Sequence, residues 1–215
     1  MESPTPKVKI EAEPIIPYVE EADFPEGLRP VLEPYQRRMG FIPNALKLYM
    51  HRPEIAEVLW TLNGRVMRDP SSTLDQQLKR KLAAVASAIN GCAYCTAHSC
   101  SMLKRPRDPE GGEGWGLSEE ELQRLISGSY VPKDEFERAS FDYVRAASED
   151  PTNVPDEILL RLKQHLSPPQ VIELACVVGF WKFYNTVHDS LHIPVESFLL
   201  SDTGYVDLAP IHASK

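Results

Sequence analysis

The sequence has no extended run of basic residues, and its formal net charge is −8 over 215 residues. Binding to nucleic-acid phosphates or to an anionic membrane surface needs concentrated lysine and arginine, so this charge argues against both kinds of partner. The longest apolar run, around 172–181, is far shorter than the ~20 residues that a helix needs to span a bilayer. We therefore expect no nucleic acid and no membrane among the partners.

Cysteine is scarce as well. Four cysteines in the whole chain are too few for a disulfide-rich secreted scaffold. Residues 1–6 show no basic segment leading into an apolar stretch, which is the pattern of a secretory signal. We therefore expect a cytoplasmic location. In a reducing cytosol, a Cys-x-x-Cys pair is more often a redox or metal-binding motif than a structural disulfide.

Strand-like alternation of apolar and polar residues is not found, whereas apolar residues recur at spacings of three and four. This pattern predicts an all-α protein. Helices are expected over about 25–38, 53–68, 73–89, 92–105, 118–127, 133–148, 155–166 and 168–190. We predict an extended N-terminal arm over 1–22, a helical domain over 23–192, and an irregular C-terminal tail over 193–215.

Several local expectations follow from these patterns. The helix over 53–68 should pack through the apolar positions that recur at helical spacing: Ile55, Val58, Leu59, Leu62 and Val66. Ser72 or Thr73 should cap the next helix. Cys176, inside an apolar run, should be a small buried residue of the core.

The most informative motif is Cys92-Ala-Tyr-Cys95-Thr-Ala-His98. Two thiols separated by two residues can form a reversible disulfide. Steps of three place Cys92, Cys95 and His98 on one face of a helix. His98 can then accept the proton of Cys95, and the N-terminal end of the helix favours a thiolate at Cys92. The motif therefore predicts thiol redox chemistry, with these three residues as the catalytic set.

Other interpretations of these residues remain open. The cysteines could be small buried hydrophobes, or Cys92, Cys95, His98 and Cys100 could bind a metal ion. Four ligands within one and a half helical turns cannot easily surround a metal tetrahedrally, so we expect none. His188, beside Asp189, is expected at a solvated helix end. The aromatic residues Trp181, Phe183 and Tyr184 suit a core better than a pocket.

The stretch from Asn90 to His98, preceded by an alanine-rich helix, resembles the signature of the alkylhydroperoxidase D-like (AhpD-like) superfamily, which includes carboxymuconolactone decarboxylase-like proteins. Residues 40–44 and 172–185 resemble its peroxidase-related branch. The resemblance implies an AhpD-like helical bundle that assembles into homotrimers or homohexamers. It also implies that Cys95 attacks, that Cys92 is its disulfide partner and that His98 belongs to the proton relay. It implies no cofactor, and a reducing protein that regenerates the dithiol.

The chain departs from that family pattern at two places. Ser99 stands where the best-characterised members carry the histidine. Lys79-Arg80-Lys81 stands where they carry a glutamate, and the nearest upstream acid is Asp75. A positive cluster can favour a thiolate electrostatically if it lies close enough.

We therefore predict a thiol-dependent reductase of hydroperoxides. Its partners would be a hydroperoxide substrate, a thiol or dithiol-protein reductant, and further copies of the same chain. One alternative is a cofactor-free lyase that acts on a lactone, as in the carboxymuconolactone branch, although that branch generally lacks the cysteine pair. A second alternative is a non-catalytic, redox-sensing oligomer whose disulfide changes its contacts.

Overall fold

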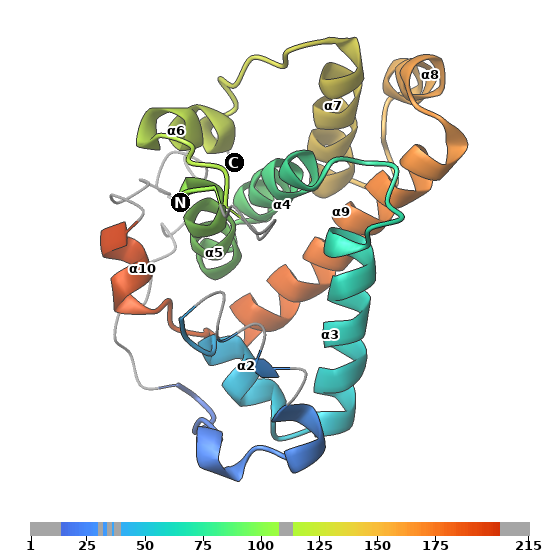
Figure 1. Cartoon of the computed structure of the whole chain (residues 1–215). Coiled ribbons are helices and arrows are strands. Elements are labelled where there is room, and N and C mark those ends of the chain that lie inside the picture. Colours follow the sequence, from blue (N-terminus) through green and yellow to red (C-terminus); the bar gives the residue numbers. More distant parts are fainter. Residues whose placement is uncertain (1–13, 30–31, 34–35, 37–39, 108–113, 203–215) are drawn as a thin grey trace, which may run out of the picture.

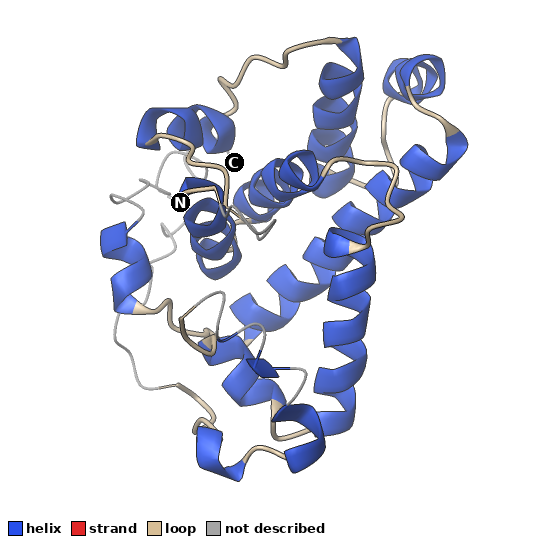
Figure 2. Cartoon of the chain, in the orientation of Figure 1, coloured by secondary structure: helices blue, strands red, loops and turns tan. Residues whose placement is uncertain are grey.

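The computed structural model describes residues 14–29, 32–33, 36, 40–107 and 114–202 (Figure 1). These residues form helices joined by loops, with no strand among them (Figure 2), so the all-α prediction is confirmed. The elements are η1 (Glu21–Asp23), η2 (Glu26–Leu28), α2 (Asn44–Tyr49), α3 (Pro53–Arg68), α4 (Gln76–Asn90), α5 (Ala93–Lys104), α6 (Glu119–Ser127), α7 (Glu135–Glu149), α8 (Asp156–His165), α9 (Pro168–Ser190) and α10 (Ser197–Asp202).

Helix α4 lies at the centre of the fold. It contacts α5, α6, α7 and α9, which surround it in Figure 1. Leu82, Ala83 and Ala86 are completely buried. A helix that is buried on all sides must carry apolar residues on every face, and its alanines let the neighbouring helices approach closely. The alanine-rich sequence of α4 thus makes it the core helix.

A glycine sets the turn that leads from α4 into α5. Gly91 has a φ of 83°, in the left-handed region where other residues are strained. The amide of Cys92 donates to the Ser87 carbonyl oxygen at 2.9 Å, which closes the end of α4. Cys92 then becomes the N-cap of α5. The Gly91 turn therefore brings the cysteine motif directly against the central helix.

The N-cap of α4 differs from the prediction. Asp75 caps this helix by accepting from the Leu78 amide at 3.0 Å. The hydroxyls of Ser72 and Thr73 donate instead to Glu173 of α9. These two side chains cannot cap α4 because they connect the preceding loop to α9.

The predicted packing face of α3 is wrong in part. Leu59 is buried, but Ile55, Val58 and Leu62 are 45%, 65% and 44% exposed. The helix turns Ala56 and Met67 inward. Helical periodicity identified an apolar stripe, but it could not show whether another part of the same chain covers that stripe.

Cys176 is exposed rather than buried. Helix α9 faces the core through Leu174, Val177, Val178 and Trp181, and Cys176 lies on the other side. The apolar run around Cys176 is therefore wider than the buried face of its helix.

The two ends of the chain are described only in part. Residues 1–13 of the predicted arm and 203–215 of the predicted tail lie outside the described residues, as does part of the helix expected over 25–38. Within the tail, Ile193, Val195 and Leu199 are buried, and 197–202 form α10, so this part is not irregular. None of the helices in the described ranges has the length and apolar character that crossing a membrane requires.

Glu173 joins three elements of the fold. Its carboxylate lies 3.0 Å from Lys79 Nζ and accepts from the Thr73 amide at 2.8 Å. Lys79 is almost completely buried and also donates to the Val66 carbonyl oxygen at 2.9 Å. Burial alone would raise the pKa of Glu173, but the hydrogen bonds from Ser72, Thr73 and Lys79 outweigh it and lower the pKa to about 2. The network ties α9 to α4 and to the end of α3.

We expect Glu173→Gln to lower the free energy of unfolding by about 1–3 kcal/mol at neutral pH, because it leaves the buried Lys79 ammonium without its carboxylate. The folded-state pKa lies below the ordinary value of 4.5, so the stabilisation by Glu173 is complete above 4.5 and is lost as the pH falls towards 2. Urea unfolding across this range should show a weaker acid dependence in the variant. Glu57→Gln, on the exposed face of α3, is the control. Equal acid dependence in Glu173→Gln and wild type would contradict the assignment.

Candidate active site

The first turn of α5 positions both cysteines. Cys92 Sγ accepts a hydrogen bond from the Cys95 amide at 3.4 Å, as an N-cap side chain does. Both thiols are free and are buried. Cys92 Sγ thus lies at the N-terminal end of α5, towards which the free backbone amides of the helix point. The expected placement of Cys92 at the start of this helix is found.

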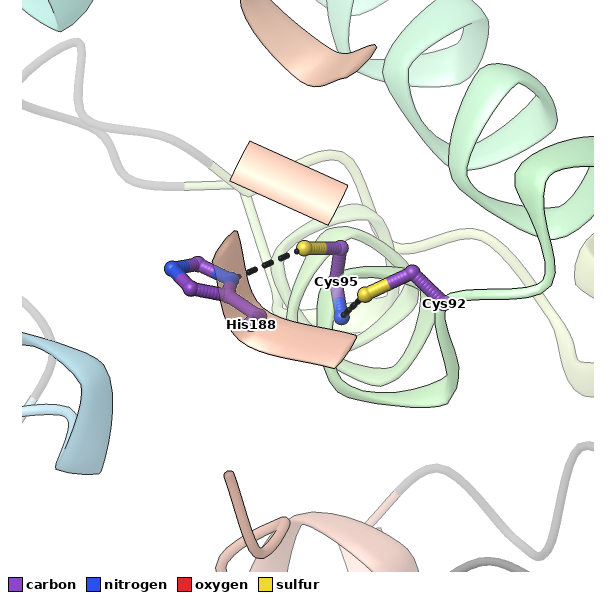
Figure 3. Close-up of side chains that lie close together, drawn as sticks. All are labelled: Cys92, Cys95 and His188. Carbon is purple, nitrogen blue, oxygen red and sulfur yellow. Dashed lines mark hydrogen bonds between the residues drawn. The ribbon is translucent and has the colours of Figure 1, made fainter. Parts of the chain in front are cut away.

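Cys95 meets a residue from a distant part of the chain. Its Sγ lies 3.1 Å from His188 Nδ1, on α9 (Figure 3). The other ring nitrogen of His188, Nε2, lies 2.9 Å from the hydroxyl of Tyr49, on α2. His188 is thus held between a thiol and a phenol. It is not at a solvated helix end, and that expectation is wrong.

Burial sets the charge states in this chain of contacts. Burial raises the pKa of the Cys95 thiol well above its usual range, and the hydrogen bond and charge of Cys92 act in the same direction. Burial lowers the pKa of His188 to about 3, with the positive charge of His98 as a second cause. Burial also raises the pKa of Tyr49. At neutral pH, the Cys95 thiol therefore keeps its proton and donates a hydrogen bond to His188 Nδ1. His188 Nε2–H in turn donates a hydrogen bond to the Tyr49 oxygen.

His98 has a different partner from the one that the motif suggests. Its Nε2 lies 2.8 Å from a carboxylate oxygen of Glu196. Its ring packs against Tyr94, with 4.4 Å between ring centroids, and Tyr94 also contacts His188. The structure places Cys92 and Cys95 together with His188, while His98 lies in the adjoining pair with Glu196.

Glu196 anchors the C-terminal segment beside the site. It accepts hydrogen bonds from the Asn44 amide at 2.6 Å and from the Tyr94 hydroxyl at 3.2 Å. Burial alone would raise its pKa, but the charge and hydrogen bond of His98, together with the Asn44 amide, leave that pKa lowered. The carboxylate–histidine pair that seemed absent from the motif region is therefore present, with the acid supplied from beyond α9.

Sequence reasoning missed His188 and Glu196 as site residues. The signal for His188 was its position on the apolar face of α9, seven residues after Trp181 and four after Tyr184. Glu196 carried no comparable local signal, since it lies in a short segment after the last long helix.

A cavity of about 100 Å³ opens beside Cys95. This volume is of the order of an apolar cavity that admits one benzene ring. Trp181 and Tyr184 line it, so they form a pocket wall as well as part of the core, while Phe183 is exposed. The lining residues are Pro43, Ala45, Leu46, Tyr49, Trp60, Asn63, Arg68, Arg80, Tyr94, Cys95, His98, Met102, Trp181, Tyr184 and His188. Cys95 lines the cavity and Cys92 does not, so Cys95 is the thiol that an occupant would meet.

The same three groups have the donor types that a soft metal ion accepts. The ligand atoms of Cys92, Cys95 and His188 all lie within 4.8 Å of one another. Two sulfurs and one imidazole nitrogen suit zinc or copper(I). This set differs from the sequence-derived alternative, because His188 replaces His98 and Cys100 does not belong to the group.

No family model matches this sequence, and no curated protein matches it. Several solved structures are similar to the fold. The debrominase Bmp8 is 20% identical, with a TM-score of 0.73 over 88% of this chain and 96% of that one. The alkylhydroperoxidase AhpD core protein of Ralstonia eutropha JMP134, described as peroxidase-related, is 17% identical, with a TM-score of 0.75 over 90% and 98%. A peroxidase-related protein from Silicibacter sp. TM1040 is 19% identical, with a TM-score of 0.72 over 88% and 97%.

These similarities show that the chain has the AhpD-like fold. The resemblance drawn from the cysteine motif is thereby confirmed at the level of the fold. Identities of 20% or less leave the reaction open, so the chemistry has to be argued from the site itself.

We expect His188→Gln to slow the reaction of Cys95 with iodoacetamide by about 10²–10⁴-fold, the usual contribution of a general base. In wild type the rate should stay flat from about pH 4 to pH 7, because His188 is neutral above about 3 and Cys95 loses its proton only at high pH. Peptide mapping by mass spectrometry measures alkylation at Cys95. His165→Gln, exposed on α8, is the control. A wild-type rate that declines below pH 6.5 would contradict a neutral His188.

Proposed function

We propose that this protein is a thiol-dependent oxidoreductase that reduces hydroperoxides. Cys95 is the attacking thiol, Cys92 the resolving thiol and His188 the proton acceptor. The observation that carries the proposal is the 3.1 Å contact between Cys95 Sγ and His188 Nδ1 at the wall of an apolar cavity. A buried thiol with a neutral base and a second thiol close by can deliver two electrons to a peroxide.

The first step oxidises Cys95. Its sulfur attacks the terminal oxygen of R–O–O–H while its proton passes to His188 Nδ1. The O–O bond breaks, and the alkoxide takes the proton from His188 to leave as the alcohol, so that Cys95 becomes a sulfenic acid. Tyr49 supports this step, because its oxygen accepts from Nε2–H and stabilises the transient imidazolium.

The second step forms the disulfide. The Cys92 sulfur attacks the Cys95 sulfur, the S–O bond breaks, and the hydroxyl takes the proton of the Cys92 thiol and leaves as water. One hydroperoxide and two thiols thus become an alcohol, water and a Cys92–Cys95 disulfide. The two Sγ atoms lie within 4.8 Å of each other. They must approach to about 2.05 Å for the bond. A thiol or dithiol-protein reductant returns the pair to its starting state.

The proposed setting follows from the sequence. We place the reaction in the cytoplasm, where reductants keep thiols reduced. We also propose a homotrimer or homohexamer, in which other copies cover part of the exposed apolar stripe of α3.

His98, with Glu196, holds the Tyr94 side of the cavity and completes the proton relay.

The test is to react pre-reduced protein with one equivalent of tert-butyl hydroperoxide and to follow the peroxide and the protein mass together. Wild type should consume the peroxide and lose the mass of two hydrogen atoms, with the disulfide mapped to Cys92–Cys95. Cys92→Ser should stop at a sulfenic acid, which gains one oxygen atom and reacts with dimedone. Cys95→Ser should consume no peroxide.

The control is Cys176→Ser, which removes an exposed thiol outside the site and should react as wild type does. Unchanged peroxide with both site thiols still free would overturn the proposal. A disulfide that forms and changes the assembly without catalytic turnover would instead support the redox-sensing alternative.

A second candidate is reductive debromination of a small aromatic ring. Trp60, Trp181 and Tyr184 line the cavity, and the fold resembles that of the debrominase Bmp8, of which a cysteine variant was solved with 2,3,4-tribromopyrrole. In this reaction, an aryl bromide and two thiols would be converted into the debrominated ring, bromide, a proton and the disulfide. Bromide release from 2,3,4-tribromopyrrole by reduced protein, without peroxide consumption, would favour this reaction.

A further inference from the structure

The two cysteines of the motif and His188 form a compact set of three metal-binding atoms. Cys92 and Cys95 come from the start of α5, and His188 comes from α9 (Figure 3). Their ligand atoms all lie within 4.8 Å of one another, and all three residues are buried. Structural zinc sites usually take their ligands from separated segments of the chain. His188 therefore removes the objection raised by the sequence, in which every donor came from a single helix.

The spacing of these atoms is close to that of a zinc site. Zn–S bonds of about 2.3 Å and a Zn–N bond of about 2.05 Å at tetrahedral angles place the sulfurs about 3.8 Å apart and each sulfur about 3.6 Å from the nitrogen. Cys95 Sγ lies 3.1 Å from His188 Nδ1. This contact has to open by only about half an ångström for a zinc ion to take the place of the Cys95 proton.

The ring of His188 is held in an orientation that suits metal binding. Its Nε2 lies 2.9 Å from the Tyr49 hydroxyl, and donation to that oxygen leaves the lone pair of Nδ1 directed towards Cys95. Tyr184 stacks on the ring, with 5.2 Å between centroids and 16° between planes. Metal-binding histidines almost always donate their other ring N–H to a neighbouring acceptor, which fixes the tautomer and the ring. Tyr49 provides that acceptor here.

Charge balance favours zinc over copper(I). Two thiolates and a neutral imidazole carry two negative charges, which one Zn²⁺ ion neutralises. Copper(I) would leave one negative charge uncompensated, and burying a net charge is costly. Three protein ligands leave the fourth position of a tetrahedral zinc ion open. Cys95 and His188 line the cavity, which can supply the fourth ligand as water or a small anion.

We infer that the reduced Cys92–Cys95 pair and His188 bind one Zn²⁺ ion per chain, with the fourth position open to the cavity beside Cys95. On binding, two Zn–S bonds and one Zn–N bond form, and the two thiol protons pass to solvent. Metal binding itself does not depend on the proposed function. Its consequence for the reaction does: the ion occupies both thiols, so zinc and hydroperoxide compete for them.

The test titrates Zn²⁺ into protein that has been reduced with a phosphine and kept free of oxygen. Competition with a chromophoric chelator should give one zinc ion per chain with a Kd below about 1 µM. Cobalt(II), used as a spectroscopic substitute, should show thiolate-to-cobalt charge transfer and the intense visible bands of a four-coordinate ion. X-ray absorption of the zinc-loaded protein should show two sulfur neighbours at about 2.3 Å and lighter neighbours at about 2.0–2.1 Å.

Loss of a ligand should weaken zinc binding strongly. Cys92→Ser, Cys95→Ser and His188→Gln should each raise the Kd by more than about 100-fold, which exceeds the usual effect of removing a partner of a ligand. Tyr49→Phe removes such a partner and should raise the Kd by about 10–100-fold. The titration and the absorption spectra of the wild-type protein decide the question even if a ligand variant does not fold.

Two cysteine variants serve as controls. Cys100→Ala removes the other buried thiol of α5, which does not belong to the group of three. Cys176→Ser removes the exposed thiol of α9, so it excludes binding at the surface. Both variants should bind zinc as tightly as wild type does. A Kd that rises with either variant as much as with Cys95→Ser would contradict the proposed ligand set.

The metal site and the hydroperoxide reductase fail in different ways. Less than one zinc ion per chain, a Kd weaker than about 1 µM, or a metal bound without sulfur would overturn the metal site, whatever the peroxide assay shows. Zinc binding without peroxide consumption by the zinc-free protein would support the metal site and overturn the reductase. If both hold, one equivalent of zinc should slow the consumption of tert-butyl hydroperoxide, and a chelator should restore it. Consumption that bound zinc leaves unchanged would overturn the competition.

Discussion

Cys95 and His188 meet in the interior of the protein, where both side chains are buried, and this desolvation governs the rest of the site. In a low-dielectric interior the charged form of each group is disfavoured, so the thiol stays protonated and the imidazole stays neutral. The resting pair is therefore S–H and N rather than the thiolate–imidazolium pair expected from the motif. In the proposed reaction, charge develops only when a substrate reacts. Preorganised groups around the pair then determine the barrier, since they need no reorganisation at that moment.

The architecture supplies these groups from separate parts of the chain. Helix α5 brings the cysteines, α9 brings His188 and α2 brings Tyr49. The segment after α9 returns with Glu196, which binds His98 on α5 and the amide of Asn44 at the start of α2. The site thus depends on the packing of these segments against one another, and local unfolding of α5 or α9 would separate His188 from Cys95.

Several helix boundaries could be predicted from the sequence because they depend on neighbouring residues, although the N-cap of α4 was not among them. Pro53 begins α3, Ser118 forms a capping box for α6, and the Asn90–Gly91 step ends α4. The face that each helix buries was harder to predict, as Ile55 shows, because periodicity does not say what lies opposite. The residues that contact the cysteines from distant parts of the chain were the hardest to predict. His188 is 93 residues from Cys95, and only tertiary packing brings the two together.

Position 80 connects the fold to the chemistry. The family resemblance puts an acid in this region, yet the chain has a buried arginine at the cavity wall. A carboxylate there would oppose negative charge on the reacting sulfur, whereas a guanidinium favours it. Burial makes the Cys95 thiolate costly to form, so its proton leaves for His188 only as the sulfur reacts in the proposed mechanism. The loss of the acid is therefore compatible with the proposed active site, in which His188 accepts the proton of Cys95.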